Sequence, residues 1–322
     1  MVSKRVLVTG ASGFIGQPLV RALVRAGYAV RAATRRPVPF PNAVDVAIVP
    51  DFRNPINWDT ILRGIDIVIH AAGYAHVDRP SEAHDLFNAI NVMTTQELSR
   101  AAAHAGIERF LFISSVRAQT GASAAGVIRE QDEVRPTDNY GRSKLAAELA
   151  LRTAGVPFTI LRPVVVYGRN PNGSIKLVVR LASLPLPLPF GNFNSQRSLL
   201  GIDNLISAIF FVLNNPATLG ETYLIADSKP LNIPEIFTMM CKAQGCRPWL
   251  VNIPPKLLQI ALMLTNHRRL WERVACDLIV DTTKLESLGW RPAIETYDGF
   301  RAMFSSENGE GFFEVEKGRP TN

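Results

Sequence analysis

The chain has 322 residues, of which 47% are hydrophobic and 20% are charged, a balance that excludes disordered, collagen-like and coiled-coil proteins. Its formal net charge of +7 is a mild basic surplus and does not indicate a nucleic-acid-binding protein. The amino terminus leads directly into a strand-like run without room for a signal peptide, and no apolar run approaches the ~20 residues of a membrane span. We therefore expect a cytoplasmic, globular protein.

Short apolar runs of strand length alternate with longer segments in which apolar residues recur three and four positions apart. Leu19 and Leu23 mark the first of the expected helices, and the spacing from Leu86 to Ala102 predicts a later one. This alternation is typical of a parallel sheet covered by helices on both faces, so we predict a doubly wound α/β fold. The expected strands are residues 6–8, 29–33, 44–49, 65–69, 110–113 and 158–161.

The regular alternation ends at Gly168. Leucine and proline alternate over residues 184–189, and further prolines interrupt the later segments. We therefore predict a first unit formed by residues 1–167, to which residues 199–226 return, and a second, smaller lobe within residues 168–322 that ends in a polar tail.

A glycine-rich loop directly follows the first expected strand and opens the first expected helix. Residues 9–16 read Thr-Gly-Ala-Ser-Gly-Phe-Ile-Gly, in the position that a dinucleotide-binding loop requires. Glycines allow a tight turn and a close approach to the pyrophosphate, and the helix amino terminus offers unpaired N–H groups to it. The first unit is therefore predicted to bind NAD(P). The expected cofactor contacts in this loop are Gly10, Ser12, Gly13, Phe14, Ile15 and Gly16.

The end of the second expected strand bears on the choice of cofactor. An acidic residue there would bind the adenosine 2′-hydroxyl, whereas arginine suits a 2′-phosphate. This chain has Thr34, Arg35 and Arg36, which favours NADP(H) and leaves NAD(H) possible; the alternative is that both arginines are solvated loop charges. Further cofactor contacts are expected after the third and fourth strands, at Asp51, Phe52, Ala71, Ala72 and Gly73.

A tyrosine and a lysine four positions apart precede a segment of strong helix formers. Tyr140 and Lys144 would share one helix face, where the lysine charge favours the phenolate of a tyrosine whose ordinary pKa is about 10. Ser115 closes the fifth expected strand at its carboxyl end, where parallel sheets bind ligands. We predict that these three residues are catalytic, with Ser115 also contacting substrate. The alternative for the pair is an exposed tyrosine and an ordinary helix-face lysine.

Together these motifs resemble an extended short-chain dehydrogenase/reductase of the nucleotide-sugar epimerase, dehydratase and reductase group, from about Val6 to about Phe300. The resemblance implies a Rossmann-type fold, hydride transfer to or from a carbinol carbon, and cofactor contacts at Asn91 and Pro163 as well as Tyr140 and Lys144. It also implies that Arg197 holds the diphosphate of a nucleotide sugar, a role that a guanidinium suits chemically. The alternative for Arg197 is an ion pair with Asp203.

Residues 188–199 resemble those of bacterial 4-reductases and 4-epimerases of UDP-sugars. Because Thr34 replaces the acidic residue of NAD-retaining epimerases, we expect an NADPH-dependent 4-keto reductase of a UDP- or dTDP-hexose in surface-polysaccharide biosynthesis. The alternatives are a UDP-sugar 4-epimerase with retained NAD, a ketone reductase of the dihydroflavonol or hydroxysteroid type, and a non-catalytic NADP-binding protein.

We also expect a homodimer. The apolar segment 254–273 carries a basic flank that would suit an anionic membrane surface, although such a helix is more typical of a core or a subunit contact. No metal site is predicted, because the histidines lack ligand spacing. These histidines are His70, His76, His84, His104 and His267.

Overall fold

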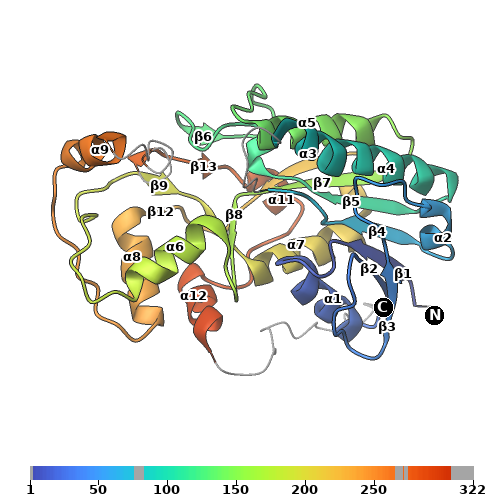
Figure 1. Ribbon diagram of the computed structural model, residues 1–322, viewed down its shortest axis with the longest axis horizontal. Helices are drawn as coiled ribbons and strands as arrows, with labels where there is room; N and C mark the ends of the chain where they lie inside the picture. The colour runs from blue at the N-terminus through green and yellow to red at the C-terminus, as the bar shows by residue number, and fades with distance from the viewer. Residues whose placement is uncertain (1–2, 76–82, 265–270, 272–274, 306–322) are drawn as a thin grey trace.

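The computed structural model describes residues 3–75, 83–264, 271 and 275–305 (Figure 1). Parallel strands form one sheet in the order β11-β7-β5-β4-β1-β2-β3. From β1 the chain adds β2 and β3 on one side of the sheet and then β4, β5, β7 and β11 on the other, which defines a doubly wound sheet. The predicted α/β fold is confirmed. The strands are β1 (Arg5–Thr9), β2 (Ala29–Thr34), β3 (Val44–Ile48), β4 (Ile67–His70), β5 (Arg109–Ile113), β7 (Phe158–Pro163) and β11 (Thr222–Ile225).

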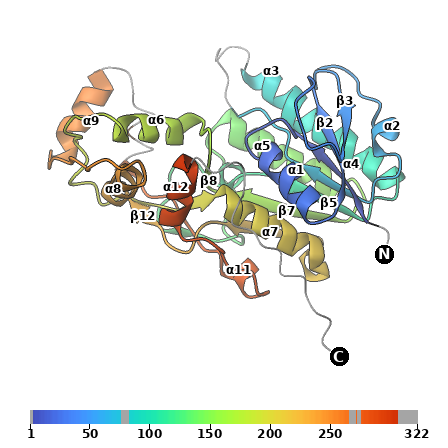
Figure 2. The ribbon, with the colours of Figure 1, turned by 90° about the horizontal axis from the view of Figure 1, so that it is seen from below.

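Helices cover both faces of this sheet (Figure 2). Side chains alternate between the faces of a strand: Val6 and Val8 join one buried cluster with helices α1 and α7, whereas Leu7 joins another with α2, α4 and α5. Because the central strands are apolar on both sides, they need both layers of helices. The helices of these layers are α1 (Gly16–Arg25), α2 (Trp58–Leu62), α4 (Thr94–His104), α5 (Asn139–Arg152) and α7 (Ile202–Asn214).

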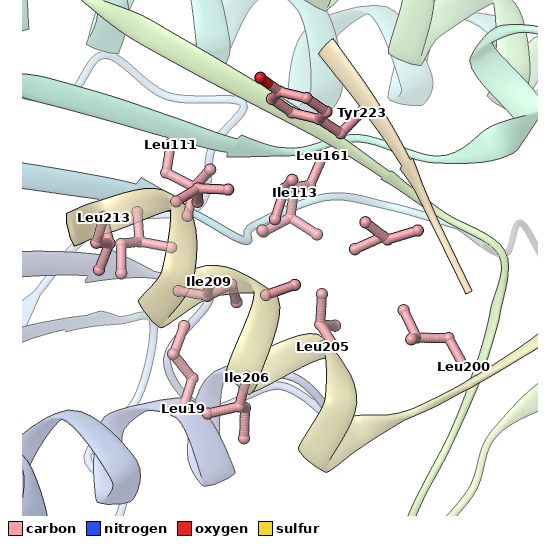
Figure 3. Packing of buried hydrophobic residues seen from close by; sticks show 14 of the residues in the cluster. Leu19, Leu111, Ile113, Leu161, Leu200, Leu205, Ile206, Ile209, Leu213 and Tyr223 are labelled. Atoms are coloured by element: carbon pink, nitrogen blue, oxygen red, sulfur yellow. The ribbon is translucent and has the colours of Figure 1, made fainter. Parts of the chain in front are cut away.

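Helix α7 brings a late part of the chain back onto the sheet. Its buried residues Leu205, Ile209 and Leu213 are spaced by one helical turn and form an apolar stripe. Figure 3 shows this stripe packed with Leu111 and Ile113 of β5. Burial of each such side chain stabilises the fold by about 1.5–3 kcal/mol relative to exposure. After α7 and the short turn η4 (Pro216–Thr218), β11 pairs with β7.

The helix predicted between Leu86 and Ala102 is interrupted. Helix α3 (Ala83–Phe87) leads into a π-helical stretch, η2 (Asn88–Met93), before α4 begins. Within it, the Thr94 N–H donates to the Ala89 carbonyl five residues earlier. The wider turn lies beside α5, and such π turns are frequent at functional sites. The side chains of η2 are therefore candidates for the functional site.

Four helices form a smaller region at the left of Figure 1, around a third apolar cluster. Aromatic packing is prominent in it: the rings of Phe190 and Phe237 stack with centroids 4.8 Å apart. Its helices are α6 (Gly173–Ala182), α8 (Ile233–Ala243), α9 (Pro255–Leu264) and α12 (Thr296–Phe304). Short strand pairs join this region to the rest: β8 (Val165–Tyr167) with β10 (Leu199–Gly201), β9 (Gln196–Arg197) with β12 (Leu231–Asn232), and β6 (Val127–Ile128) with β13 (Ile279–Val280), which α11 (Thr283–Glu286) follows.

Within the ranges that the structure describes, no helix is both long enough and apolar enough to cross a membrane. Helix α9 does carry exposed apolar side chains, among them Leu257 and Ile260. The basic flank predicted after it at 267–269, and the polar tail from 306 onward, lie outside the described residues.

Candidate active site

The glycine loop lies against the carboxyl end of β4. Gly10 has a φ of +68°, and a Cβ atom there would come within 2.7 Å of the Ala72 amide nitrogen. A Cβ on Gly16 would lie 2.1 Å from the Gly10 carbonyl oxygen. The sequence therefore needs glycine at both positions, and their lack of side chains leaves a cradle for a pyrophosphate. Ser12 and Gly13 are exposed, and Phe14 and Ile15 are partly buried where α1 begins without a side-chain cap.

The end of β2 leaves one polar atom unsatisfied. The hydroxyl of Thr34 is buried and has no hydrogen-bond partner among the described residues. Arg35 and Arg36 are exposed beside it, and the Arg35 guanidinium lies 3.8 Å from the Asp51 carboxylate. Hydrogen bonds from Arg53 lower the pKa of Asp51, with the charge of Arg35 contributing least. This edge thus holds a hydroxyl and paired charges where a cofactor ribose is expected.

The other predicted cofactor contacts surround the ends of β3 and β4. Phe52 packs on the second apolar cluster, and Ala72 donates its N–H to the Thr9 hydroxyl at 3.4 Å, beside the partly buried Ala71. A Cβ on Gly73 would lie 3.4 Å from Asn91 Oδ1 and 3.8 Å from Lys144 Nζ. Gly73 thus lies between the glycine loop, which its neighbour Ala72 contacts, and the predicted catalytic Lys144.

Ser115, Tyr140 and Lys144 meet at the carboxyl end of β5. Ser115 begins the short turn η3 (Val116–Ala118), and Tyr140 lies in the first turn of α5, within hydrogen-bonding reach of the Ser115 side chain. Lys144 is buried, donates to the Ile113 carbonyl at 2.8 Å, and lies 4.0 Å above the centre of the Phe112 ring. The structure therefore brings the three predicted catalytic side chains together.

Burial acts on both titratable groups of this site. It raises the pKa of Tyr140, and this rise is opposed by the hydrogen bond from Ser115 and by the charge of Arg117. Burial also lowers the pKa of Lys144 from its ordinary value to about 7, against the opposing charge of Glu148. A lysine with this pKa gains or loses its proton near neutrality, which suits a residue that assists proton transfer.

Asn91, which the resemblance assigned to the cofactor, holds two parts of the site in place. Its Oδ1 accepts from the Tyr74 N–H at 2.7 Å, and its Nδ2 donates to the Tyr74 carbonyl at 3.0 Å and to the Ser143 hydroxyl at 2.9 Å. Asn91 comes from the π-helical stretch, so the wider turn positions the amide between β4 and α5. Its direct contact with a cofactor remains a prediction.

A buried histidine, for which no metal site is predicted, connects several parts of the site. His70 ends β4 with Nδ1 2.6 Å from the Thr9 hydroxyl and Nε2 3.0 Å from the Thr95 hydroxyl. Thr95 donates to the Asn91 carbonyl, so its oxygen accepts from Nε2–H and Nδ1 accepts from Thr9. Burial lowers the pKa of His70 to about 3, which keeps it neutral. The network ties β1, β4 and η2 together beneath the cofactor loop.

A buried ion pair fixes α5 one turn beyond Lys144. Arg162 of β7 donates to Glu148 from Nε at 3.0 Å and from Nη2 at 2.6 Å, and from Nη1 to Gln119 at 2.8 Å. Ser114 also donates to Glu148. Neither residue is among the predicted site residues; the available signal was an arginine that directly follows the apolar run of an expected strand. Pro163, the predicted cofactor contact that follows, is buried at the end of β7.

Arg197 lies on β9 and is 8% exposed. Its guanidinium donates to the carbonyl oxygens of Cys276 and Ala122, each at 2.8 Å, so it joins three distant parts of the chain. Next to it lies an open cavity of about 510 Å³. The lining includes Asn192, Ser195, Trp271, Cys276 and Asp277. The predicted contact of Arg197 with a diphosphate remains a prediction.

A glycine loop between β1 and α1, with serine, tyrosine and lysine at the adjacent sheet edge, is the arrangement expected of an enzyme that binds a nicotinamide dinucleotide. The family model described as the NAD dependent epimerase/dehydratase family matches residues 6–226. The chain belongs to that family, which confirms the resemblance and its identification as an enzyme of this type.

Two relatives and one solved structure extend the match. UDP-glucose 4-epimerase of Vibrio cholerae is 29% identical over 310 residues, covering 92% of this chain and 94% of the relative. Ceramide reductase of Caulobacter vibrioides is 29% identical over 253 residues, covering 77% of this chain and 73% of the relative. The structure of MoeE5 in complex with UDP-glucose and NAD is 26% identical with a TM-score of 0.74, covering 93% of this chain and 97% of that one.

Proposed function

We propose that this protein is a UDP-sugar 4-epimerase that uses NAD. The observation that carries the proposal is the meeting of Ser115, Tyr140 and Lys144 beside the glycine loop. The UDP-glucose 4-epimerase of Vibrio cholerae, similar over nearly its full length, supports this reaction over the NADPH-dependent reduction favoured by the sequence.

The residues present fit the dinucleotide. The cradle left by Gly10 and Gly16 would hold the pyrophosphate, and the unsatisfied Thr34 hydroxyl would face the adenosine ribose. NAD supplies a hydride acceptor and donor when bound. His70 holds Thr9, which precedes this cradle, and Asn91 holds Tyr74, which follows Gly73.

The three side chains divide the proton chemistry. Tyr140 takes the proton of the sugar C4 hydroxyl when that carbon is oxidised and returns it when the carbon is reduced on the opposite face. Ser115 donates a hydrogen bond to the same oxygen, and Lys144 stabilises the charge of the phenolate. The buried Glu148–Arg162 pair fixes the helix that carries Tyr140 and Lys144.

Arg197 and the neighbouring cavity are proposed to hold the diphosphate and the nucleoside. The guanidinium already binds two carbonyl oxygens, so it is held rigidly for an incoming anion. Because every residue that lines this cavity lies between 192 and 277, the lobe within residues 168–322 is proposed as the substrate-binding part and residues 1–167 with 199–226 as the NAD-binding part.

A second candidate is an NADPH-dependent ketone reductase. It is favoured by one observation, the exposed Arg35 and Arg36 after β2 with no carboxylate at Thr34. The similarity to a ceramide reductase is compatible with this reaction. Three further expectations from the sequence remain proposals. They are a role in surface-polysaccharide biosynthesis, a homodimer in the cytoplasm, and contact of the 254–273 segment with a membrane surface.

The test is to purify the protein, identify any nucleotide that it carries, and assay a panel of UDP-hexoses for C4 interconversion. Interconversion with catalytic amounts of NAD, and without net NADH formation, supports the epimerase. Stoichiometric NADPH consumption with a UDP-4-keto sugar, and no interconversion, would establish the reductase instead. Tight dinucleotide binding without turnover of any of these compounds would contradict both enzymes.

A further inference from the structure

Arg117 joins the turn that carries Ser115 to the helix that carries Tyr140. Its N–H donates to the Ser115 hydroxyl at 3.2 Å, so its backbone shares the hydroxyl proposed to bind substrate. Its carbonyl oxygen lies close to Gly141: a Cβ atom on Gly141 would be only 2.2 Å from this oxygen. Any larger residue at position 141 would push this turn away from α5. The backbone of Arg117 therefore sets the distance between the two catalytic groups.

The Arg117 side chain reaches the start of the same helix. Its guanidinium, 21% exposed, pairs with the carboxylate of Asp138. The other oxygen of Asp138 accepts from the Gly141 N–H at 2.7 Å and caps α5. One carboxylate thus caps the helix and anchors the guanidinium, which places a positive charge within the first turn, next to Tyr140.

Several other charged residues of the described part of the chain lie near Tyr140. At its own helix these are the N-cap Asp138, Arg142, which donates to Asn139, and Lys144, which is directed to the Ile113 carbonyl. Helix α3 packs its Phe87 ring at 6.0 Å from the tyrosine ring and carries one exposed acid, Asp85. The other titratable residues on the described elements that pack against α5 are His84 of α3, Arg162 of β7, which is matched by Glu148, and three residues of α4: Glu97 in its first turn, Arg100, and His104 at its end.

We propose that Arg117 is a positioning residue for the reaction: it fixes the Ser115–Tyr140 geometry and stabilises the phenolate. The inference rests on the proposed acid–base role of Tyr140. No atom of Arg117 is transferred; the proton moves between the sugar hydroxyl and the tyrosine oxygen, and the guanidinium favours the state in which the oxygen is charged. The guanidinium, which keeps its charge throughout this pH range, would thus support a task that the sequence motif gives to lysine alone.

The proposal is tested by changing the two partners separately. Arg117→Gln removes the positive charge, whereas Asp138→Asn removes the negative charge and keeps an N-cap oxygen. The ionisation of Tyr140 is followed by NMR of protein labelled with ¹³Cζ-tyrosine, with NAD present and with Tyr140→Phe to assign the signal. We expect Arg117→Gln to raise the pKa of Tyr140 by about one unit and Asp138→Asn to lower it. Both variants break the same contact, so a merely structural role would shift the two in one direction and overturn the proposal.

Turnover provides the second readout. The alkaline rise of kcat should move to higher pH in Arg117→Gln, return toward the original position in Arg117→Lys, and stay in place in Arg135→Gln, which removes an exposed arginine next to Glu133. Unchanged NMR titration and pH profile in Arg117→Gln would overturn the proposal. Because the NMR titration needs no substrate, full activity of Tyr140→Phe would refute the proposed function without altering the titration result.

Discussion

The two sides of the active site are built differently. On the proposed cofactor side, the backbone is placed by the pairing of the neighbouring strands β1 and β4. Gly10 follows β1, and Ala72 and Gly73 follow β4. On the proposed substrate side, the Arg197 side chain donates to the carbonyl oxygens of Ala122 and Cys276. These two residues lie 75 and 79 positions from Arg197 in the sequence. In the proposed function, the chemistry would therefore take place at the edge of one sheet, whereas substrate recognition would depend on contacts between segments far apart in the sequence.

The largest expected effect is at the sheet edge itself. Tyr140→Phe removes the group proposed to exchange the C4 proton while preserving the ring that packs near Phe87. We expect kcat to fall by about 10²–10⁴-fold and NAD affinity to be retained. Steady-state kinetics and a fluorescence titration with NAD measure the two quantities. A variant with kcat close to that of the original protein would show that the proton travels by another route.

A matched pair of glycines tests the rigidity of the cofactor side. Gly10 and Gly106 have φ values of +68° and +69°, but only Gly10 faces a neighbouring backbone, that of Ala72. Alanine at either position costs about 1–2 kcal/mol for the left-handed conformation. We expect Gly10→Ala also to weaken NAD binding on the order of tenfold, about 1.4 kcal/mol, by calorimetry. Equal NAD affinity in the two variants would show that the loop tolerates a side chain.

The substrate side is probed by a conservative change. Arg197→Lys keeps the charge but loses the planar fork that reaches the Ala122 and Cys276 carbonyls. We expect KM for the UDP-sugar to rise about tenfold with a smaller change in kcat, since the lost interaction contributes to binding. Arg180→Lys, on the exposed face of α6, is the control. An unchanged KM would remove Arg197 from the substrate site.

The smallest expected effect is at Arg35. This guanidinium is 63% exposed and lies 3.8 Å from Asp51, so its removal should alter stability by less than about 1 kcal/mol. Arg35→Ala should lower kcat/KM for any NADP(H)-dependent turnover about fivefold and leave NAD(H)-dependent turnover nearly unchanged. Parallel kinetics with both cofactors measure this ratio. An equal loss with both would mean that Arg35 does not read the 2′-position.

Local patterns account for what the sequence predicts well. The glycine loop, the strands and the Tyr140–Lys144 spacing each depend on a few adjacent residues, and the structure places them as expected. The π-helical turn at Asn91 and the His70 network could not be predicted, because each requires side chains from separate strands or helices. The same holds for the Glu148–Arg162 pair, whose two residues meet only after α5 packs on β7.

Hydride return within one active site is the central claim, and isotope retention tests it most directly. The purified protein is incubated with UDP-glucose, UDP-N-acetylglucosamine or UDP-glucuronic acid carrying deuterium at C4, together with unlabelled NAD. If the hydride returns within one active site, at least one of these sugars converts to its C4 epimer with the deuterium still at C4. No epimer from any of them, or epimers whose C4 deuterium has been replaced by hydrogen, would contradict it.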